Sequence, residues 1–191
     1  MIRIANENDA GALLGIYSYY IENTAITFEC DVPTVEEFAC RIKETLNRYP
    51  YFVFEDNGEI LGYAYAGALV KRAAADHSVE VSIYIKNGCQ KSGYGRKLYE
   101  ALEIALRQQN IINVYALIAY TDTEDEHLTH NSVEYHSHLG YREVGKLCRC
   151  GYKFGKWYDL VWMEKLIGEY EETPKPFVPF SEINKSYENK K

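Results

Sequence analysis

The chain has 191 residues, 47% of them apolar, and its 28 acidic side chains outnumber its 21 basic ones for a net charge of −7. This length suits one domain with a sizeable core, and no apolar run is long enough for a membrane helix, so we expect no membrane partner. The acidic balance argues against nucleic acid as a partner.

The first half of the chain alternates strand-like and helix-like patterns, each with a recognisable end signal. The expected elements are a strand at residues 2–5, a helix capped by Asn8 or Asp9, a helix opened by the capping-box pattern Thr34–Glu37 and ended by Pro50, and a hairpin of Tyr51–Phe54 and Ile60–Tyr65 around Asn57-Gly58.

The second half continues the alternation and predicts a mixed α/β domain with one central sheet. The expected elements are a strand at Val79–Ile85, a helix that follows Gly95 and stops at Asn110, a strand at Val114–Ala119, a helix from the capping-box pattern Asn131–Glu134 to Gly140, and strands at 141–148 and 157–165. We assign residues 1–166 to the domain. Residues 167–191, with three prolines and a Lys190-Lys191 end, predict an arm outside the core that is in part disordered.

The cysteines and histidines carry no clear pattern of a disulfide framework or a metal site. The five cysteines are odd in number and scattered, and the N-terminus has no signal-peptide character, so we expect reduced thiols in a cytoplasmic protein. His127, His130, His136 and His138 lie near acidic residues, but their spacing forces no open three-ligand set, and we expect no metal. The cysteines are Cys30, Cys40, Cys89, Cys148 and Cys150.

The most informative segment is a glycine loop between a β-branched strand and a helix. Gly93 and Gly95 let the backbone approach a ligand closely, and the helix start adds unpaired N–H donors, so the loop predicts an anion site. The loop lacks the Lys-Ser or Lys-Thr of a P-loop and the third glycine of a dinucleotide fingerprint. Its pattern Gln90-x-x-Gly-x-Gly95 resembles the pyrophosphate loop of the GCN5-related N-acetyltransferases (GNAT), which bind acetyl-CoA; an ordinary glycine turn is the alternative.

Four segments resemble one subgroup of that superfamily, the phosphinothricin and methionine sulfone/sulfoximine acetyltransferases. They occur in the order of the subgroup and are spread over about residues 1–165: Ile16–Phe28, Val79–Ile85, Ser132–Tyr141 and Gly151–Asp159. The resemblance implies a mixed sheet splayed at a V, with acetyl-CoA in the opening. It also implies an acyltransferase of class EC 2.3.1 that acetylates a primary amine by direct attack in a ternary complex.

The chemistry of amine acetylation asks for a base, an oxyanion donor and a proton for the departing thiolate. Glu80 matches the catalytic glutamate of the family, with a solvated strand carboxylate as the alternative. The resemblance implies that a backbone N–H near Ile83 to Ile85 stabilises the oxyanion. His136 occupies the position of the thiolate's proton donor, with the neighbouring Tyr135 as second choice; a histidine with a purely packing role is the alternative.

The resemblance also implies which residues contact each substrate. The expected acetyl-CoA contacts are Ile83, Tyr84, Ile85, Lys91, Ser92, Gly93, Tyr94, Gly95, Arg96, Thr129, Asn131 and Ser132. The expected contacts of the amine substrate are Phe28, Arg72, Lys153 and Phe154.

Two departures from the subgroup affect these expectations. Thr129 stands where relatives usually have Asn, and Asn131 is a candidate replacement, although its capping-box position already suggests a structural role. Before Glu80 the subgroup tends to read R-x-A-Y-R, whereas here Arg72 is kept and Ala75 and Asp76 replace Tyr and Arg. A small, acidic wall argues against phosphinothricin and favours a neutral or cationic amine.

Three functions remain open at this point. The first is a small-molecule amine N-acetyltransferase, with an amino acid or analogue as substrate. The second is an acetyltransferase of proteins, peptides or polyamines, and the third is a catalytically silent acyl-CoA-binding module. Retention of Glu80 and His136 disfavours the third.

The segment Gly151–Tyr158 predicts a homodimer. It is rich in aromatic residues and is expected to be a loop joining the last two strands, where a monomer has little reason to expose such side chains. The matching loop of the family lies near the subunit boundary. The alternative is that Phe177 and Phe180 of the C-terminal arm cover these aromatic residues.

Overall fold

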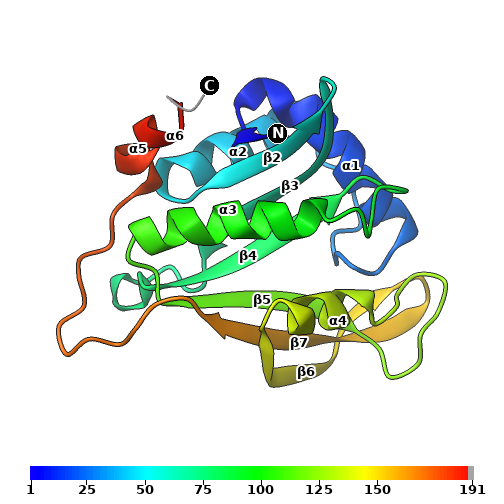
Figure 1. Cartoon of the computed structure of the whole chain (residues 1–191). Coiled ribbons are helices and arrows are strands. Elements are labelled where there is room, and N and C mark those ends of the chain that lie inside the picture. The colour runs from blue at the N-terminus through cyan, green and yellow to red at the C-terminus, as the bar shows by residue number, and fades with distance from the viewer. Residues whose placement is uncertain (189–191) are drawn as a thin grey trace.

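The computed structural model describes residues 1–188 and contains one seven-stranded sheet in the order β1-β2-β3-β4-β5-β7-β6 (Figure 1). All neighbouring strands are antiparallel except β4 and β5, which are parallel. This confirms the expected mixed α/β fold. The strands are β1 (Ile2–Ile4), β2 (Tyr51–Asp56), β3 (Glu59–Ala68), β4 (Ser78–Ile85), β5 (Asn113–Tyr120), β6 (Arg142–Lys153) and β7 (Lys156–Leu166).

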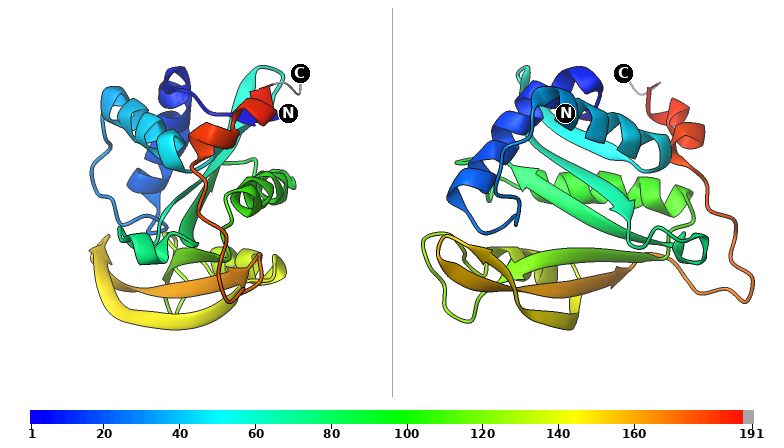
Figure 2. Two further views of the ribbon diagram at one scale, coloured as in Figure 1. Left: turned by 90° about the vertical axis from the view of Figure 1, so that its left-hand side faces the viewer. Right: turned by 180° about the vertical axis from the view of Figure 1, so that it is seen from behind.

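Helices cover both faces of the sheet. α1 and α2 lie on one face, and α3 and α4 lie on the other, as the two views of Figure 2 show. Lys190 and Lys191 of the tail lie outside the described residues, and no described helix is both long and apolar enough to cross a membrane. The longer helices are α1 (Ala10–Asn23), α2 (Val35–Arg48), α3 (Tyr94–Gln108) and α4 (Asn131–His138); short ones are η1 (Glu7–Asp9), η2 (Ala73–Ala75), α5 (Phe180–Ile183) and α6 (Lys185–Glu188).

The sheet splays between β4 and β5. The two strands pair over only three positions, Ser78 with Asn113, Val79 with Val114, and Glu80 with Tyr115. Beyond Glu80 both strands continue but no longer pair, which opens the sheet into a V. The expected V-shaped sheet is confirmed.

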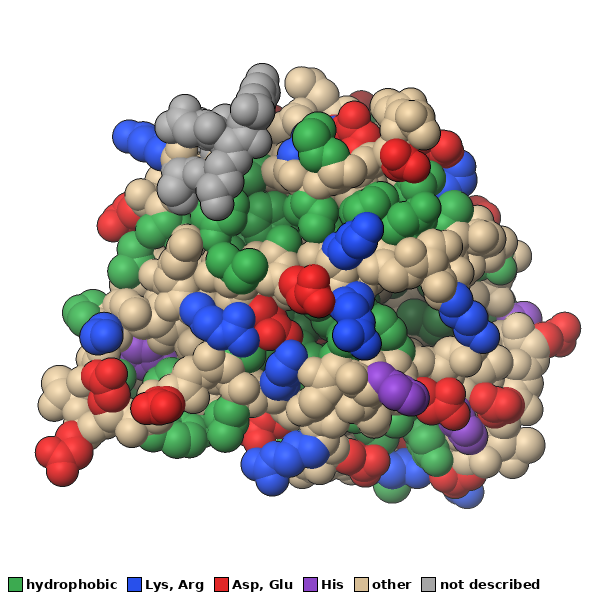
Figure 3. Space-filling model, viewed as in Figure 1, with side chains coloured by type: hydrophobic (Ala, Val, Ile, Leu, Met, Phe, Trp, Pro, Cys, Tyr) green, Lys and Arg blue, Asp and Glu red, His purple; other side chains and the backbone are tan. Residues whose placement is uncertain are grey.

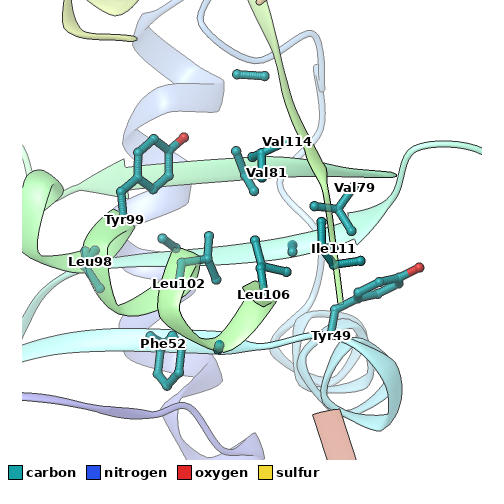
Figure 4. Packing of buried hydrophobic residues seen from close by; sticks show 14 of the residues in the cluster. Tyr49, Phe52, Val79, Val81, Leu98, Tyr99, Leu102, Leu106, Ile111 and Val114 are labelled. Atoms are coloured by element: carbon teal, nitrogen blue, oxygen red, sulfur yellow. The ribbon is translucent and has the colours of Figure 1, made fainter. Parts of the chain in front are cut away.

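Two hydrophobic clusters hold the layers together. The first lies between the sheet and α3, where Leu98, Leu102 and Leu106 pack against Val79 and Val81 of β4 (Figure 4). The second lies under α1 and α2 and is built from their apolar faces and the tyrosines of β2 and β3. Burial of these side chains, at about 1.5–3 kcal/mol each, fixes both helical layers against the strands that carry the V.

The local end signals are partly confirmed. Thr34 and Glu37 form the predicted capping box, and the Asn57-Gly58 turn has positive φ at both residues, as a type I′ hairpin requires. Asp9 is the residue that precedes α1, as expected, but its side chain makes no capping bond within α1. The capping side chain is that of Asn6, which accepts from Asn8 N–H at the start of η1.

The capping box predicted at Asn131 is also wrong. α4 begins with His130 as its cap residue, without a capping side chain, and the amide of Glu134 bonds to the carbonyl of His130. The side chain of Asn131 is therefore not used as a helix cap.

The last two strands are longer than predicted. The expected loop 151–158 instead continues both strands, which meet in a tight turn at Phe154-Gly155 with positive φ at both residues. Extra residues near Val144 and between Leu147 and Gly151 interrupt the pairing of β6 with β7. These bulges break the alternation of apolar and polar residues by which a strand is predicted from sequence.

The C-terminal arm packs on the core, so its expected position outside the core is wrong. Phe180 is fully buried against Phe52 of β2, and the side-chain amide of Gln109 donates to Val178 O at 2.8 Å. Phe177 lies on the ring of Tyr49. Phe177 and Phe180 therefore do not cover the aromatic residues of the β6–β7 hairpin, so the alternative explanation of that hairpin is wrong.

Candidate active site

A cavity of about 60 Å³ lies inside the V. It begins at Val81, directly after the last paired position of β4, and is walled by β4 on one side and by β5 residues 116–119 on the other. α3 and α4 contribute Tyr99, Ser132 and His136, and the loop after α1 contributes Ile26. On the face that carries α3 and α4, Figure 3 shows a hollow beside Lys and Arg side chains.

Glu80 marks the point where the V opens. It is the last residue of β4 that pairs with β5, and its other neighbour in the sheet is Gly67 of β3. Side chains alternate along a strand, so Glu80 shares the α1–α2 face with Tyr84, which packs on Tyr17 and Tyr20. Burial raises the pKa of Glu80 above its ordinary value, which makes the carboxylate a stronger base.

The backbone of β4 beyond Glu80 offers N–H donors to the cavity. Lys86 N–H bonds to Leu61 of β3, and the direction of N–H groups alternates along a strand, so the N–H groups of Ile83 and Ile85 point away from β3. The hydroxyl of Tyr20 donates to Ile85 O at 2.5 Å and fixes the end of this strand. The expected oxyanion donors therefore face the opening of the V.

The glycine loop ends at an uncapped helix. Gly93 precedes α3 with φ +80° and provides no capping side chain, so the first N–H groups of the helix, at Tyr94, Gly95 and Arg96, have no partner within it. Lys91 also has positive φ, and with Ser92 it is exposed. The loop and helix start therefore have the geometry of an anion site.

Gly95 serves a purpose that its sequence pattern did not predict. A Cβ at this position would lie 2.7 Å from Tyr135 Oη and 3.4 Å from Ile83 Cδ1. The missing side chain therefore allows α3 to approach α4 and β4 closely. Tyr94 stacks on Phe54 with ring centroids 4.3 Å apart and so anchors the helix start to β2.

His136 is buried and held in one tautomer. Nδ1 lies 2.7 Å from Ser132 O, a carbonyl that only accepts, so Nδ1 carries the proton and Nε2 accepts from the hydroxyl of Tyr99 at 2.9 Å. Burial lowers the pKa of His136 to about 4, so the imidazole is neutral near pH 7. A neutral ring whose single N–H is already bonded has no proton to give in this arrangement.

Tyr135, by contrast, has a hydroxyl without a partner. Its oxygen is buried and makes no hydrogen bond among the described residues, and it faces Gly95 at the start of α3. Burial raises its pKa, while Arg96 acts in the opposite direction. Orphaned buried hydroxyls are rare in native proteins, so this one is suited to a bound ligand.

The N-terminal part of α4 contributes backbone more than side chains. Thr129 and Asn131 are exposed, and Ser132 lines the cavity while its carbonyl orients His136. Direct contact of Thr129, Asn131 and Ser132 with acetyl-CoA stays a prediction.

Of the four residues expected at the amine substrate, Phe28, Lys153 and Phe154 lie together at the β6–β7 hairpin, whereas Arg72 lies in a different hollow. Phe28 packs over Gly151, where a Cβ would meet its ring at 2.2 Å, and Phe154 stacks on His127 in the hairpin turn. The ammonium of Lys153 is buried and donates to the carbonyls of Thr24 and Thr27, each at 2.9 Å. Lys153 therefore holds the loop after α1.

The region before β4 differs from the expected acidic wall. Arg72 is exposed and precedes η2 without a capping side-chain bond, while the carboxylate of Asp76 pairs with Arg48 of α2 at 2.7 Å. The charge of Asp76 is thus compensated, and the argument that it disfavours an anionic substrate loses its physical basis.

Two functional residues were missed in the sequence. Tyr99 and Tyr20 both lie at helix positions that a helical apolar pattern assigns to the core, and both use their hydroxyls on site groups, His136 Nε2 and Ile85 O. A buried tyrosine usually bonds its hydroxyl, and that was the only available signal. Among the described residues, no group of three or more His, Cys, Asp or Glu is arranged to hold a metal ion.

Comparisons with known proteins agree with this geometry. The family model "Acetyltransferase (GNAT) domain" matches residues 2–162. The chain is 32% identical to a phosphinothricin N-acetyltransferase of Streptomyces viridochromogenes, over 95% of both chains. It is 29% identical to an L-methionine sulfoximine/L-methionine sulfone acetyltransferase of Salmonella typhimurium, over 88% of this chain and 95% of the relative.

A solved structure of a relative also agrees with this fold. The crystal structure of a phosphinothricin acetyltransferase from Sinorhizobium meliloti in complex with acetyl-CoA aligns with a TM-score of 0.81 and 27% identity, over 94% of this chain and 97% of that one. The chain therefore belongs to the GNAT family, in the phosphinothricin and methionine sulfoximine acetyltransferase-like subgroup, and is an acetyl-CoA-dependent N-acetyltransferase.

Proposed function

We propose that this enzyme acetylates the primary amine of a free amino acid or a close analogue, by direct attack in a ternary complex. The observation that carries the proposal is the position of Glu80, a desolvated carboxylate at the closed end of the V, next to unpaired backbone donors. The names of the relatives, which act on phosphinothricin and on methionine sulfoximine, support an amino-acid-like acceptor.

Acetyl-CoA supplies an activated acetyl group as a thioester, and the chain provides groups that fit it. The uncapped start of α3 suits the pyrophosphate, with Lys91, Ser92, Gly93, Tyr94, Gly95 and Arg96 as its contacts. The orphan hydroxyl of Tyr135 lies near Gly95 on the side of Ile83, between the helix start and the oxyanion donors, so we assign it to the sulfur end of the donor.

Each step of the transfer then has a group on the chain. Glu80 accepts the proton of the attacking amine, directly or through a water. The N–H groups of Ile83 and Ile85 stabilise the negative charge that develops on the carbonyl oxygen. Tyr135 donates its proton to the departing thiolate, and His136 positions Tyr99 and the start of α4 rather than transferring a proton.

The assignment of the proton donor to Tyr135 reverses the order expected from the sequence. The reason is physical: the only N–H of His136 is bonded to Ser132 O, whereas the Tyr135 hydroxyl has no described partner. Both residues stay candidates for experiment, and variants of Tyr135 and of Tyr99, the hydrogen-bond partner of His136, are compared below.

The acceptor class is tested by thiol release from acetyl-CoA with a panel of amines. The panel contains free amino acids, phosphinothricin, methionine sulfone, a polyamine and a lysine-containing peptide. We expect the highest kcat/KM for a free amino acid or analogue. A clear preference for the peptide or polyamine would establish the alternative acetyltransferase, and acetyl-CoA binding without thiol release for any amine would establish the silent module.

We further propose that the enzyme works as a homodimer in the cytoplasm. Tyr152, Phe154 and Trp157 at the tip of the β6–β7 hairpin remain 59%, 41% and 57% exposed, and no part of the described C-terminal arm covers them. Exposed aromatic clusters are frequent at interfaces. All five cysteines are free thiols, which suits a reducing compartment. Light scattering at micromolar concentration tests the assembly, and a mass near 22.1 kDa would rule out the dimer.

A further inference from the structure

The face of the sheet that carries Glu80 contains a second hollow, lined by aromatic side chains. It has a volume of about 240 Å³ and lies between α2 and the strands β2 and β3, on the side seen from behind in Figure 2. We call it the tyrosine pocket; it is formed by Tyr17, Phe38, Tyr51, Tyr63 and Tyr65, with Arg41, Glu44 and Thr45 at its α2 side.

The walls of the tyrosine pocket are rigid. Tyr51 stacks on Tyr65 with ring centroids 4.8 Å apart and planes 15° apart, and on Tyr63 at 5.7 Å. Phe38 meets Tyr63 edge to face at 6.3 Å, and Tyr17 is fixed by a hydrogen bond to Thr27 at 2.8 Å. Such a pocket is preformed, so little binding free energy is lost to ordering the side chains of the pocket when a ligand binds.

The tyrosine pocket is close to Glu80. Tyr65 is the register partner of Ser82, two residues from Glu80, and Gly67 is the partner of Glu80 itself. Glu80 contributes to a raised pKa of the Tyr65 phenol, although burial is the larger cause. At Gly67 a Cβ would meet no atom within 4 Å, so the space beside this glycine is open.

A larger hollow of about 550 Å³ adjoins the tyrosine pocket. It shares Glu44 and Thr45 with it and extends past Gly67 to Lys71 and Arg72. Lys71 and Arg72 therefore lie at the end away from the aromatic rings, together with the ion pair of Arg48 and Asp76. Glu80 is the register partner of Gly67, which lines this hollow.

We propose that the tyrosine pocket binds the side chain of the amino-acid acceptor and selects large apolar, above all aromatic, side chains. In this arrangement the α-amine is at Glu80 and the α-carboxylate is directed towards Lys71 and Arg72. The proposal rests on the proposed function and adds the substrate class. Aromatic walls favour an aromatic guest through offset stacking. The charge of Arg41 at the rim is compensated by Glu29 at 2.8 Å, so the selection rests on the aromatic walls.

The first measurement is the selectivity of the wild-type enzyme for glycine, L-alanine, L-leucine and L-phenylalanine. We expect kcat/KM to be about 10- to 100-fold higher for L-phenylalanine than for L-alanine, from the burial of the additional apolar surface. An enzyme that acetylates glycine and L-alanine as well as L-phenylalanine would overturn the tyrosine pocket as a specificity site and leave the proposed function intact.

The second measurement fills the pocket. Thr45→Trp places a ring in it from α2, and Lys43→Trp, on an exposed position of the same helix, is the matched control. We expect Thr45→Trp to lower the ratio of kcat/KM for L-phenylalanine over L-alanine about 10-fold or more, and Lys43→Trp to leave the ratio unchanged. Equal losses for both acceptors in Thr45→Trp would contradict the proposal. If Thr45→Trp does not fold, Thr45→Met is the smaller filler, and the wild-type selectivity decides independently.

A third measurement separates this proposal from the proposed function. If no amine releases thiol, the proposed function fails, but L-phenylalanine binding to the CoA-saturated protein still tests the pocket by calorimetry. Binding that is lost in Thr45→Trp and kept in Lys43→Trp supports the pocket. The absence of binding to the wild-type protein overturns it.

Discussion

The two sides of the splayed sheet are built in different ways. On the side of α3 and α4 the site consists largely of backbone: uncapped N–H groups, a positive-φ glycine and a close helix approach at Gly95. On the side of α1 and α2 it consists of side chains, with Glu80 beside a stack of tyrosines. A backbone site suits a donor that is the same in every reaction, and a side-chain site can vary with the acceptor.

Because the two sides are built differently, we expect substitutions on them to affect different kinetic and binding constants. Changes on the α1–α2 side are expected to alter turnover and acceptor selectivity. Changes at the start of α3 are expected to alter acetyl-CoA affinity. Tyr135 and His136 lie between the two sides and are adjacent in sequence, yet the structure gives them opposite hydrogen-bonding states.

The largest effect is expected at Glu80. Glu80→Gln keeps the size of the side chain but removes the base, so kcat should fall by about 10²- to 10⁴-fold while acetyl-CoA affinity is nearly unchanged. Steady-state kinetics and calorimetry on the same preparation measure both. A kcat within about twofold of the wild-type value would mean that Glu80 has a structural role and is not the base.

The second effect concerns the anion site. Gly93→Asp places a carboxylate where the pyrophosphate is expected, and Asp tolerates a positive φ better than most residues, so acetyl-CoA affinity should fall about 100-fold or more. Gly88→Asp is the matched control, because Gly88 has a similar φ of +84° in the same loop but lies outside the segment 91–96. Equal losses in both variants would mean that loop distortion, and not the anion site, is measured.

The third effect distinguishes Tyr135 of α4 from Tyr99 of α3, the hydrogen-bond donor to His136. Tyr135→Phe should lower kcat about 10- to 100-fold without loss of stability, because it removes a hydroxyl that has no described partner. Tyr99→Phe should instead lower stability by about 1 kcal/mol, because it leaves His136 Nε2 without its donor. A Tyr135→Phe enzyme with unchanged kcat would return the role of proton donor to His136.

The smallest effect is a pH dependence of stability. The pKa of His136 is about 4 in the folded state and 6.5 ordinarily, so as the pH falls from 7 the unfolded chain binds the proton first and stability is lost. This group alone should cost about 2 kcal/mol between pH 7 and pH 5. Denaturant unfolding of the wild type and of His136→Asn at both values measures it; an identical pH dependence in the two proteins would contradict a buried neutral imidazole.

Much of the fold and of the donor side could be predicted from the sequence, for a physical reason. Backbone sites and turns depend on glycine, Asn-Gly and capping residues, which act locally and leave a pattern. The Thr34 capping box and the Asn57-Gly58 turn are of this kind, and so is the glycine loop before α3.

The remaining features of the fold and of the site depend on contacts between distant segments, and such contacts leave no local pattern in the sequence. The pairing of Asp76 with Arg48, the bonding of Lys153 to the loop after α1 and the burial of Phe180 all join residues far apart in sequence. The role of Gly95 depends likewise on Tyr135 of another helix. For the same reason the tyrosines of β2 and β3 appeared only as strand residues and not as a pocket.

The most direct test of the account is the initial-rate pattern with both substrates varied. In the proposed mechanism acetyl-CoA and the acceptor occupy opposite sides of the V at the same time, and the amine attacks the acetyl carbonyl carbon while Glu80 accepts its proton. This mechanism involves no acetylated residue. It therefore predicts intersecting double-reciprocal lines and no acetyl group left on the protein after incubation with acetyl-CoA alone. Parallel lines, together with a covalently acetylated protein, would contradict it.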